Sequence, residues 1–271
     1  MSQRLAIIAL IAIGLVGSLP HSGKAETVRV VFPYVPSFIE SPDEGLIIEV
    51  YKAVAQHSGQ DIEIEVLPVR RALKDFAQGS FDVFGAFPSL APVPPSLASV
   101  PYVLRANVVF YKPAKFYASV EDLSDLAGRR VGLSAYLYPA FITDHPDIEY
   151  ERVPDDLTLF RMLASNRIDA AIIGRVGGMR MRTQLGLENV IANSSVAISS
   201  ENIFALFAAN RSGIVNHQKF NQAIYDMLCN GTLAAILRDP ELVPDVSIVE
   251  RDIPPAERSE SCEPQRISLI P

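Results

Sequence analysis

The chain has 271 residues, of which 49% are hydrophobic, so it is long enough to bury a substantial core in one large domain or two smaller ones. Its formal net charge is −7. Binding to nucleic-acid phosphates needs clustered Lys and Arg, so an acidic chain without a basic run is a poor nucleic-acid binder, and we expect no such partner.

The first 25 residues have the pattern of a secretory signal. Arg4 is followed by an uncharged run over residues 5–20, and Gly23 and Ala25 place small residues at positions −3 and −1 of a cleavage site. We predict a signal peptide over residues 1–25 and a mature protein that is free in an extracytoplasmic space. A retained membrane anchor is the alternative, although the run is shorter than the ~20 residues that span a bilayer.

The mature chain begins with an apolar strand at residues 28–31, followed by a loop whose Tyr34 and Phe38 rings are candidates for the rim of a binding site. Residues 45–58 form an amphipathic helix, and residues 61–66 alternate acidic with aliphatic side chains, as a half-exposed strand does. The order strand, helix, strand predicts that the two strands pair in parallel.

The stretch from Leu67 to Leu90 has the pattern of a helix, a stop and a buried strand. The stop is Gly79, because a helix end favours a residue that tolerates positive φ. The same pattern returns 87 positions later, with Asn166 in the place of Gly79 and Asp169 in the place of Asp82. Two such units predict two similar α/β lobes that face each other. Chance is the alternative, since helix–Gly–strand junctions are common.

The boundaries of the lobes follow from changes along the chain. We predict lobe 1 over residues 26–104, lobe 2 over residues 105–205 and a return to lobe 1 over residues 206–239. Residues 88–101 hold five prolines, too many for a helix interior or a central strand, and are expected to be a loop on the cleft side of lobe 1.

The end of the chain changes character. Residues 240–271 are rich in Pro, Glu and Ser with little periodicity, which predicts an extended tail, and truncation after about Asp239 is expected to leave binding intact. After export, Cys229 and Cys262 would meet oxidising conditions, and we predict a disulfide between them that attaches the tail to a helix. A pair of free thiols is the alternative.

Seven short segments resemble, in the right order, a known family, and together they cover nearly all of the mature chain up to about Asp239. They are Tyr34-x-Pro36-x-Phe38, Gly45-Leu46-x-x-Glu49-Val50, Gly79-x-Phe81-Asp82-Val83, Pro101-Tyr102, Asp122-Leu123-x-x-Leu126-x-Gly128-x-x-Val131-Gly132, Asn166-Arg167-Ile168-Asp169-Ala170 and Asn230-Gly231-Thr232-Leu233-x-x-Ile236-Leu237. The chain thereby resembles periplasmic solute-binding proteins of the polar amino-acid type, family 3.

The resemblance implies a fold and a role. Such proteins have two α/β lobes, joined by two crossover strands, that close on a small molecule. The expected function is extracytoplasmic binding of a small solute in the cleft between the lobes, for delivery to an ABC-type permease or a membrane sensor. The resemblance also implies a periplasmic location, and we expect a monomer.

Two departures from the family bear on the ligand. Amino-acid binders carry a Thr-x-x-Arg segment after the strand that contains Asp82, and its Arg binds the α-carboxylate, whereas residues 90–95 here contain no Arg. They also carry an Asp five residues beyond the one matching Asp169, which holds the α-ammonium group, whereas this chain has Gly174 there. We therefore expect an anionic or aromatic solute rather than a neutral amino acid.

The candidate binding residues are of two kinds. Bidentate recognition of a carboxylate or phosphate calls for Arg, and the candidates are Arg71, Arg175 and also Arg105, with a solvated surface position as the alternative for each. Aromatic rings in the inter-lobe loops could stack on a flat ligand, with loop packing as the alternative, and Ser89 could donate a hydrogen bond, as its family position suggests. The predicted ligand-binding set is Tyr34, Phe38, Arg71, Ser89, Tyr136, Tyr138 and Arg175.

We predict no enzymatic activity, no catalytic residue, no metal and no cofactor. The histidines lack the spacing of a zinc site, and neither Gly-x-Ser-x-Gly nor a P-loop occurs. The alternative is an enzyme on the same fold, such as a periplasmic cyclohexadienyl dehydratase, which needs a carboxylic acid in the cleft. Glu40 and Asp144 are the acids in predicted cleft loops.

Overall fold

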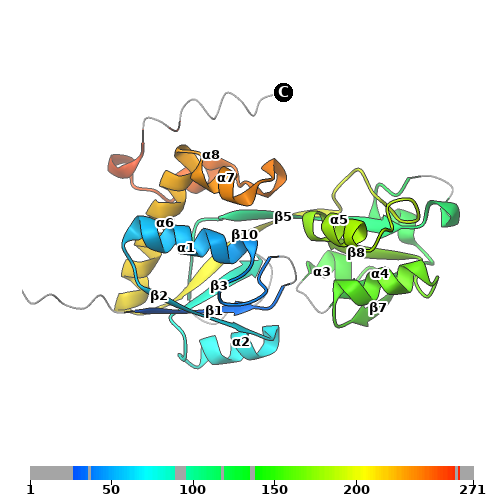
Figure 1. The fold of residues 1–271 in the computed structure, drawn as a ribbon, viewed down its shortest axis with the longest axis horizontal. Coiled ribbons are helices and arrows are strands. Elements are labelled where there is room, and N and C mark those ends of the chain that lie inside the picture. Colours follow the sequence, from blue (N-terminus) through cyan, green and yellow to red (C-terminus); the bar gives the residue numbers. More distant parts are fainter. Residues whose placement is uncertain are drawn as a thin grey trace, which may run out of the picture.

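A computed structural model describes residues 27–35, 38–88, 96–116, 119–134, 138–259 and 262, so the predicted signal peptide lies outside the described residues. The described chain forms two α/β lobes linked by two long strands (Figure 1). The predicted two-lobed α/β fold with two crossover strands is therefore confirmed.

One path of hydrogen-bonded strands runs through both lobes, in the order β2-β1-β3-β10-β5-β8-β6-β7. Lobe 1 holds β1 (Val28–Pro33), β2 (Ile62–Leu67), β3 (Val83–Pro88) and β4 (Ser96–Ala98), and lobe 2 holds β6 (Arg130–Ser134), β7 (Glu149–Val153), β8 (Ala170–Gly174) and β9 (Ala192–Asn193). The β1–β2 pair is parallel, as predicted, and so are β1–β3, β6–β7 and β6–β8.

The crossover strands are β5 (Val103–Tyr111) and β10 (Ser199–Ala208). They pair antiparallel with each other, from Val103 opposite Ile203 to Asn107 opposite Ser199. Beyond Asn107, β5 pairs with β8 of lobe 2, whereas the later residues of β10 pair with β3 and β4 of lobe 1. The strands of the two lobes are therefore joined through one short antiparallel ladder.

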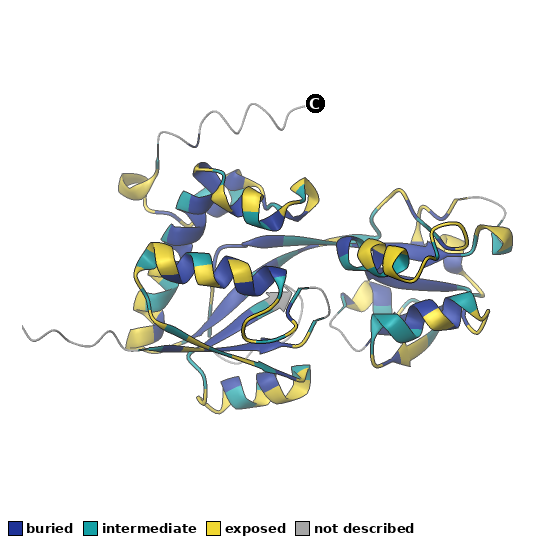
Figure 2. Ribbon diagram, in the orientation of Figure 1, coloured by how far each residue is buried: buried dark blue, intermediate teal, exposed yellow. Residues whose placement is uncertain are grey.

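Helices cover the sheet in each lobe, with their buried sides toward it (Figure 2). Lobe 1 has α1 (Leu46–Ser58), α2 (Val69–Ala77), α6 (Arg211–Cys229), α7 (Thr232–Leu237), α8 (Val246–Glu250) and the 3-10 turns η3 (Pro240–Leu242) and η4 (Pro255–Glu257). Lobe 2 has α3 (Ala140–Thr143), α4 (Asp156–Ala164), α5 (Arg175–Gln184) and the 3-10 turns η1 (Pro113–Lys115) and η2 (Leu123–Leu126). In the described part of the chain, no helix is long and apolar enough to cross a membrane.

The two similar units have the helix, stop and strand that the sequence predicts. In lobe 1, α2 is followed by Gly79 with φ of +79° and then by β3. In lobe 2, α4 is followed by Asn166 with φ of +58° and then by β8. Glycine and asparagine are the residues that adopt this left-handed conformation at low cost, so their positions mark the helix ends in the sequence.

The C-terminal segment differs from the extended tail that its composition predicts. Over residues 240–259 it forms η3, α8 and η4. Four of its aliphatic side chains belong to the lobe 1 core and are at most 7% exposed: Leu242, Val246, Val249 and Ile253. Their spacing repeats every three to four residues, which is the helical signal that the prolines and acids between them obscure. The predicted Cys229–Cys262 disulfide is present and joins the segment to α6.

Candidate ligand-binding site

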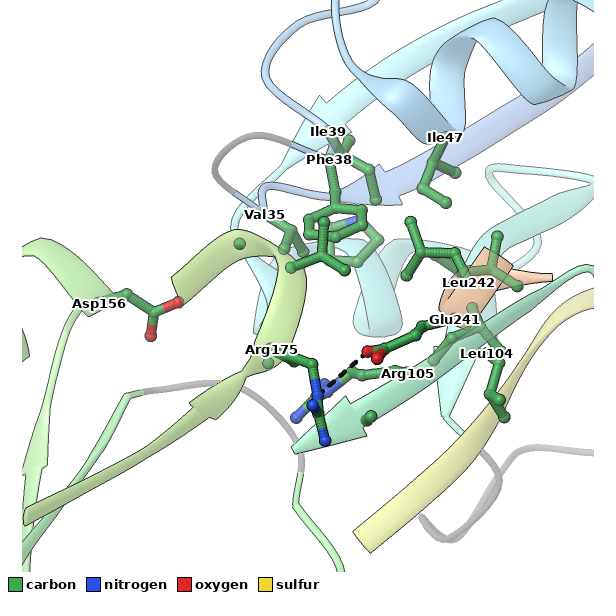
Figure 3. Close-up of a pocket in the computed structure, with 18 of the residues that line it drawn as sticks. Val35, Phe38, Ile39, Ile47, Leu104, Arg105, Asp156, Arg175, Glu241 and Leu242 are labelled. Atoms are coloured by element: carbon green, nitrogen blue, oxygen red, sulfur yellow. Dashed lines mark ion pairs between the residues drawn. The ribbon is translucent and has the colours of Figure 1, made fainter. Parts of the chain in front are cut away.

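A cavity of about 120 Å³ lies between the lobes, where β5 and β10 cross. In lobe 1, its lining comes from β1, the β1–α1 loop, β3, η3 and the first turns of α1 and α2. Lobe 2 contributes the end of β8, α4, α5 and the segment before α3, and both crossover strands contribute as well (Figure 3). Most of the described lining residues are apolar, and the charged ones are Arg105, Asp156, Arg175 and Glu241. Two cationic and two acidic side chains therefore face a mainly apolar space.

The lobe 1 wall of the cavity is apolar. Phe38 and Ile39 lie in the loop after β1, Ile47 lies on α1 and Leu242 on η3 (Figure 3). The Phe38 ring also meets α5 of lobe 2, because a Cβ added at Gly177 would lie 3.2 Å from Phe38 Cε2. The ring thus forms part of the wall and part of the contact between the lobes, and it offers an apolar face to a ligand.

Tyr138 lines the cavity from lobe 2. Its hydroxyl donates to the carbonyl oxygen of Ile172 at 3.0 Å and lies 3.0 Å from the Ser134 hydroxyl. Burial raises the pKa of Tyr138 well above its usual range, and the nearby Asp156 carboxylate raises it further. The phenol is therefore neutral and held in place, so that its ring is a fixed surface of the cavity.

Arg105 projects from β5 and is held by a buried polar network. Its Nε donates to Asn107 Oδ1 at 3.0 Å, and Asn107 Nδ2 donates to Ser199 Oγ at 2.8 Å and to Glu201 Oε1 at 2.7 Å. Asn107 is 0% and Glu201 3% exposed, so this network lies inside the crossing of the two strands. The Arg105 guanidinium lies over the Tyr138 ring, 5.1 Å from its centroid. The cavity thus has a pre-positioned cation beside the ladder of β5 and β10.

Asp156, the first residue of α4, faces the cavity from lobe 2 (Figure 3). Burial raises the pKa of its carboxyl to about 6, against the lowering effects of a Ser134 hydrogen bond and the Arg105 charge. Its Oδ1 is buried and has no hydrogen-bond partner among the described residues. The neighbouring Asp155 caps α4 by accepting from Thr158 N at 2.7 Å. In the Asp155-Asp156 pair, one acid therefore caps the helix and the second is left for the cavity.

Arg175 and Glu241 lie together at the edge of the cavity. Arg175 Nε is 3.1 Å from Glu241 Oε2 (Figure 3), and Arg175 Nη2 donates to the carbonyl oxygen of Ser195 at 3.2 Å. Arg175 belongs to the predicted ligand-binding set. Glu241 does not, because it lies in the segment that its composition predicts to be extended.

The predicted site residues are divided by the structure. Phe38, Tyr138 and Arg175 are brought together around the cavity. Tyr34 is 47% exposed, and neither it nor Arg71 belongs to the described lining.

The Arg71 side chain is 65% exposed, with its Nε 3.3 Å from Asp75 Oδ2 in the next turn of α2. Ser89 and Tyr136 lie outside the described residues. The remaining candidate, Arg105, does line the cavity.

The acids named for the enzymatic alternative lie elsewhere. Glu40 and Asp144 are exposed and do not belong to the described lining, whereas Asp156 and Glu241 do. Among the described residues, no group of three or more His, Cys, Asp or Glu side chains is arranged to hold a metal ion.

Comparison with known proteins identifies the fold. No protein-family model matches the chain. No curated protein matches it either. Among solved structures it is similar to an ancestral arginine-binding protein bound to arginine, at 20% identity over 78% of this chain and 96% of that chain, with a TM-score of 0.63.

Two further structures extend the likeness. The GluR0 ligand-binding core from Nostoc punctiforme in complex with L-glutamate is 16% identical over 77% of this chain and 96% of that chain, with a TM-score of 0.63. A histidine kinase sensor domain with similarity to periplasmic binding proteins is 17% identical over 82% of this chain and 99% of that chain, with a TM-score of 0.67. The chain therefore has the two-lobed type II fold of periplasmic binding proteins, as the sequence resemblance implied.

Proposed function

We propose that the protein binds a small solute in the cavity between its lobes, outside the cytoplasm, for delivery to an ABC-type permease or a membrane sensor. The observation that carries this proposal is the lining of the cavity, which includes side chains from both lobes and from both crossover strands. A ligand there touches both lobes, so it can favour one arrangement of them over another. The ligands and the sensor role named for the similar structures support the same reading.

The lining also supports a class of ligand. Phe38 and Tyr138 offer ring surfaces, and Arg105 and Arg175 offer guanidinium groups that can bind a carboxylate or phosphate in two parallel hydrogen bonds. An anionic or aromatic solute remains the ligand that we propose.

Native mass spectrometry of the protein as purified would identify a ligand that co-purifies with it. The rise in melting temperature that this ligand causes, compared between variants, would then test whether it binds in the cavity. Saturation at about 100 times Kd should stabilise the protein by about 2.7 kcal/mol. We expect Arg105→Ala to lose most of this shift, whereas Arg71→Ala, with the same charge change outside the described lining, should keep it. Equal shifts in the native protein and in Arg105→Ala would contradict the proposed location.

A second candidate function is acid-assisted dehydration, and Asp156 is the observation that favours it. A dehydratase on this fold needs a carboxylic acid in the cleft to expel a hydroxyl group, and the pKa of Asp156, about 6, keeps a protonated fraction near neutral pH. Purified protein would be assayed on prephenate and arogenate. Turnover that Asp156→Asn abolishes and Glu40→Gln preserves would establish this activity, and no turnover of either compound would remove the candidate.

A further inference from the structure

The Arg175–Glu241 ion pair crosses from one lobe to the other. Arg175 is the first residue of α5 in lobe 2, and Glu241 belongs to η3, which packs on lobe 1. Their charged groups are 3.1 Å apart, and both residues line the cavity. A carboxylate of the protein itself is thus paired with a cationic side chain of the candidate ligand site.

Lobe 1 holds the backbone of Glu241 firmly. Asp239 Oδ1 accepts a hydrogen bond from the backbone N–H of Glu241 at 2.9 Å, and the next residue, Leu242, is 3% exposed within the core. Arg238 Nη2 also contacts Glu49 Oε2 of α1 at 2.7 Å. The Glu241 side chain is nevertheless 52% exposed. Its carboxylate can therefore leave Arg175 by side-chain rotation alone, while η3 stays in place.

Lobe 2 holds Arg175 independently of Glu241. Its Nη2 donates to the carbonyl oxygen of Ser195 at 3.2 Å, and its side chain is 22% exposed. Its Nε is buried and makes no hydrogen bond within the described structure, although it lies in ion-pair distance of Glu241. The contact is therefore electrostatic without the alignment of a hydrogen bond. A carboxylate that is free to orient can form the two parallel bonds that a guanidinium favours.

We propose that Arg175 binds the anionic group of the ligand, most simply a carboxylate, and that Glu241 occupies this position until the ligand displaces it. The proposal rests on the solute-binding function proposed above and adds a subsite, a chemical class and a built-in competitor. It accounts for the balanced charges of the cavity, because the second acid is the group that the ligand replaces. Solutes without an anionic group would bind without displacing Glu241.

Benzoate and benzamide test this inference, since they share a ring and differ in charge. Binding of both probes would be measured by calorimetry on the full chain. We expect Glu241→Gln to bind benzoate at least about fivefold more tightly than the native protein, a ratio that matches one partly exposed charge interaction, with no change for benzamide. Glu63→Gln is the matched control, because it removes an equal charge from an exposed position on β2 of lobe 1, outside the described lining, and it should leave both affinities unchanged.

Arg175→Gln provides the second arm. It should lower the affinity for benzoate to that for benzamide, and adding Glu241→Gln to it should then have no further effect. Unchanged or weaker benzoate binding in Glu241→Gln, or an equal gain in Glu63→Gln, would overturn the inference while benzamide binding still supported the cavity. If neither probe binds the native protein or Glu241→Gln, the inference fails for carboxylates and the proposed binding cavity is contradicted as well.

Discussion

The side chain of Asp169 accepts a 3.1 Å hydrogen bond from the backbone N–H of Arg130, the first residue of β6. In lobe 1, Asp82 accepts the corresponding bond from the backbone N–H of Arg29 at 2.9 Å. Asp169 directly precedes β8, which pairs with β6, the strand that contains Arg130. In the same way, Asp82 directly precedes β3, which pairs with β1, the strand that contains Arg29. The two similar units of the sequence therefore share a specific contact as well as a helix and a strand.

Asp169→Asn should destabilise the protein in a pH-dependent way. Burial alone would raise the pKa of Asp169, but the hydrogen bond from Lys115 (2.6 Å), the Arg130 N–H and both positive charges lower it overall. A lowered folded-state pKa gives stability that is present above the unfolded pKa and lost as pH falls through the folded one. We expect a loss of about 1–3 kcal/mol in the free energy of unfolding at pH 7. Urea titrations at pH 7 and pH 3 would check this, and an equal loss at both would indicate packing instead.

Asp156→Asn should change the stability of the protein in the opposite direction, by stabilising it at high pH. Because the folded-state pKa of Asp156 is about 6, against 3.8 for a solvent-exposed aspartate, the folded protein holds the proton more tightly and loses stability as pH rises from about 4 to 6. The variant should therefore be more stable than the native protein at pH 8, by up to about 3 kcal/mol, and nearly equal to it at pH 4. Thermal melts across this range would measure the difference. Glu188→Gln, at an exposed acid, should show no such trend, and the idea fails if the two variants behave alike.

Asn107→Ala should lower both stability and affinity, although Asn107 is outside the described lining. Its loss removes a donor from the buried Glu201 and the acceptor that orients Arg105. We expect a cost of about 1–3 kcal/mol in unfolding free energy. Adding Glu201→Gln should restore part of the stability, because it removes a buried charge that has lost the Asn107 donor, while leaving the affinity low. Additive losses of stability in the double variant would show that the two side chains act separately.

Truncation after Asp239 should prevent cooperative folding, contrary to the expectation from composition. It removes four side chains of the lobe 1 core, each at most 7% exposed. Burying one such side chain stabilises a protein by about 1.5–3 kcal/mol, so the total is comparable to the whole stability of a domain. Circular dichroism recorded on heating should show no cooperative unfolding transition for the truncated chain.

The control for truncation is the full chain with both Cys229→Ser and Cys262→Ser. It loses the disulfide and about 3–4 kcal/mol of loop-closure stabilisation, but it keeps the apolar contacts and should still unfold cooperatively. A truncated chain that melts like this control would mean that the segment is dispensable for lobe 1.

The parts of the fold and of the site that can be predicted from the sequence are those with a local signal. Gly79 and Asn166 mark helix ends because few residues accept their φ, and Arg175 follows directly from the end of a buried strand. Arg105 was harder to place, because its direction depends on Asn107 and on partners in a strand more than 90 residues away. Glu241 enters the site through the packing of its neighbour Leu242 on lobe 1. The spacing of the buried aliphatic residues that begins at Leu242 indicates this packing, but it does not indicate that residue 241 lies beside the cavity.

The ladder between β5 and β10 makes lobe 2 an insertion into lobe 1. The chain leaves at Asn107 and comes back at Ser199, and these residues are paired partners in the same antiparallel ladder. A two-residue Asn-Gly turn joining residue 107 to residue 199 would close the strands as an ordinary β-hairpin. Replacing residues 108–198 by this turn would therefore leave lobe 1 as one continuous chain. In the opposite direction, a single insertion at such a hairpin is enough to add the second lobe. Lobe 1 is built from segments on both sides of lobe 2 in the sequence, so no single internal deletion would remove it.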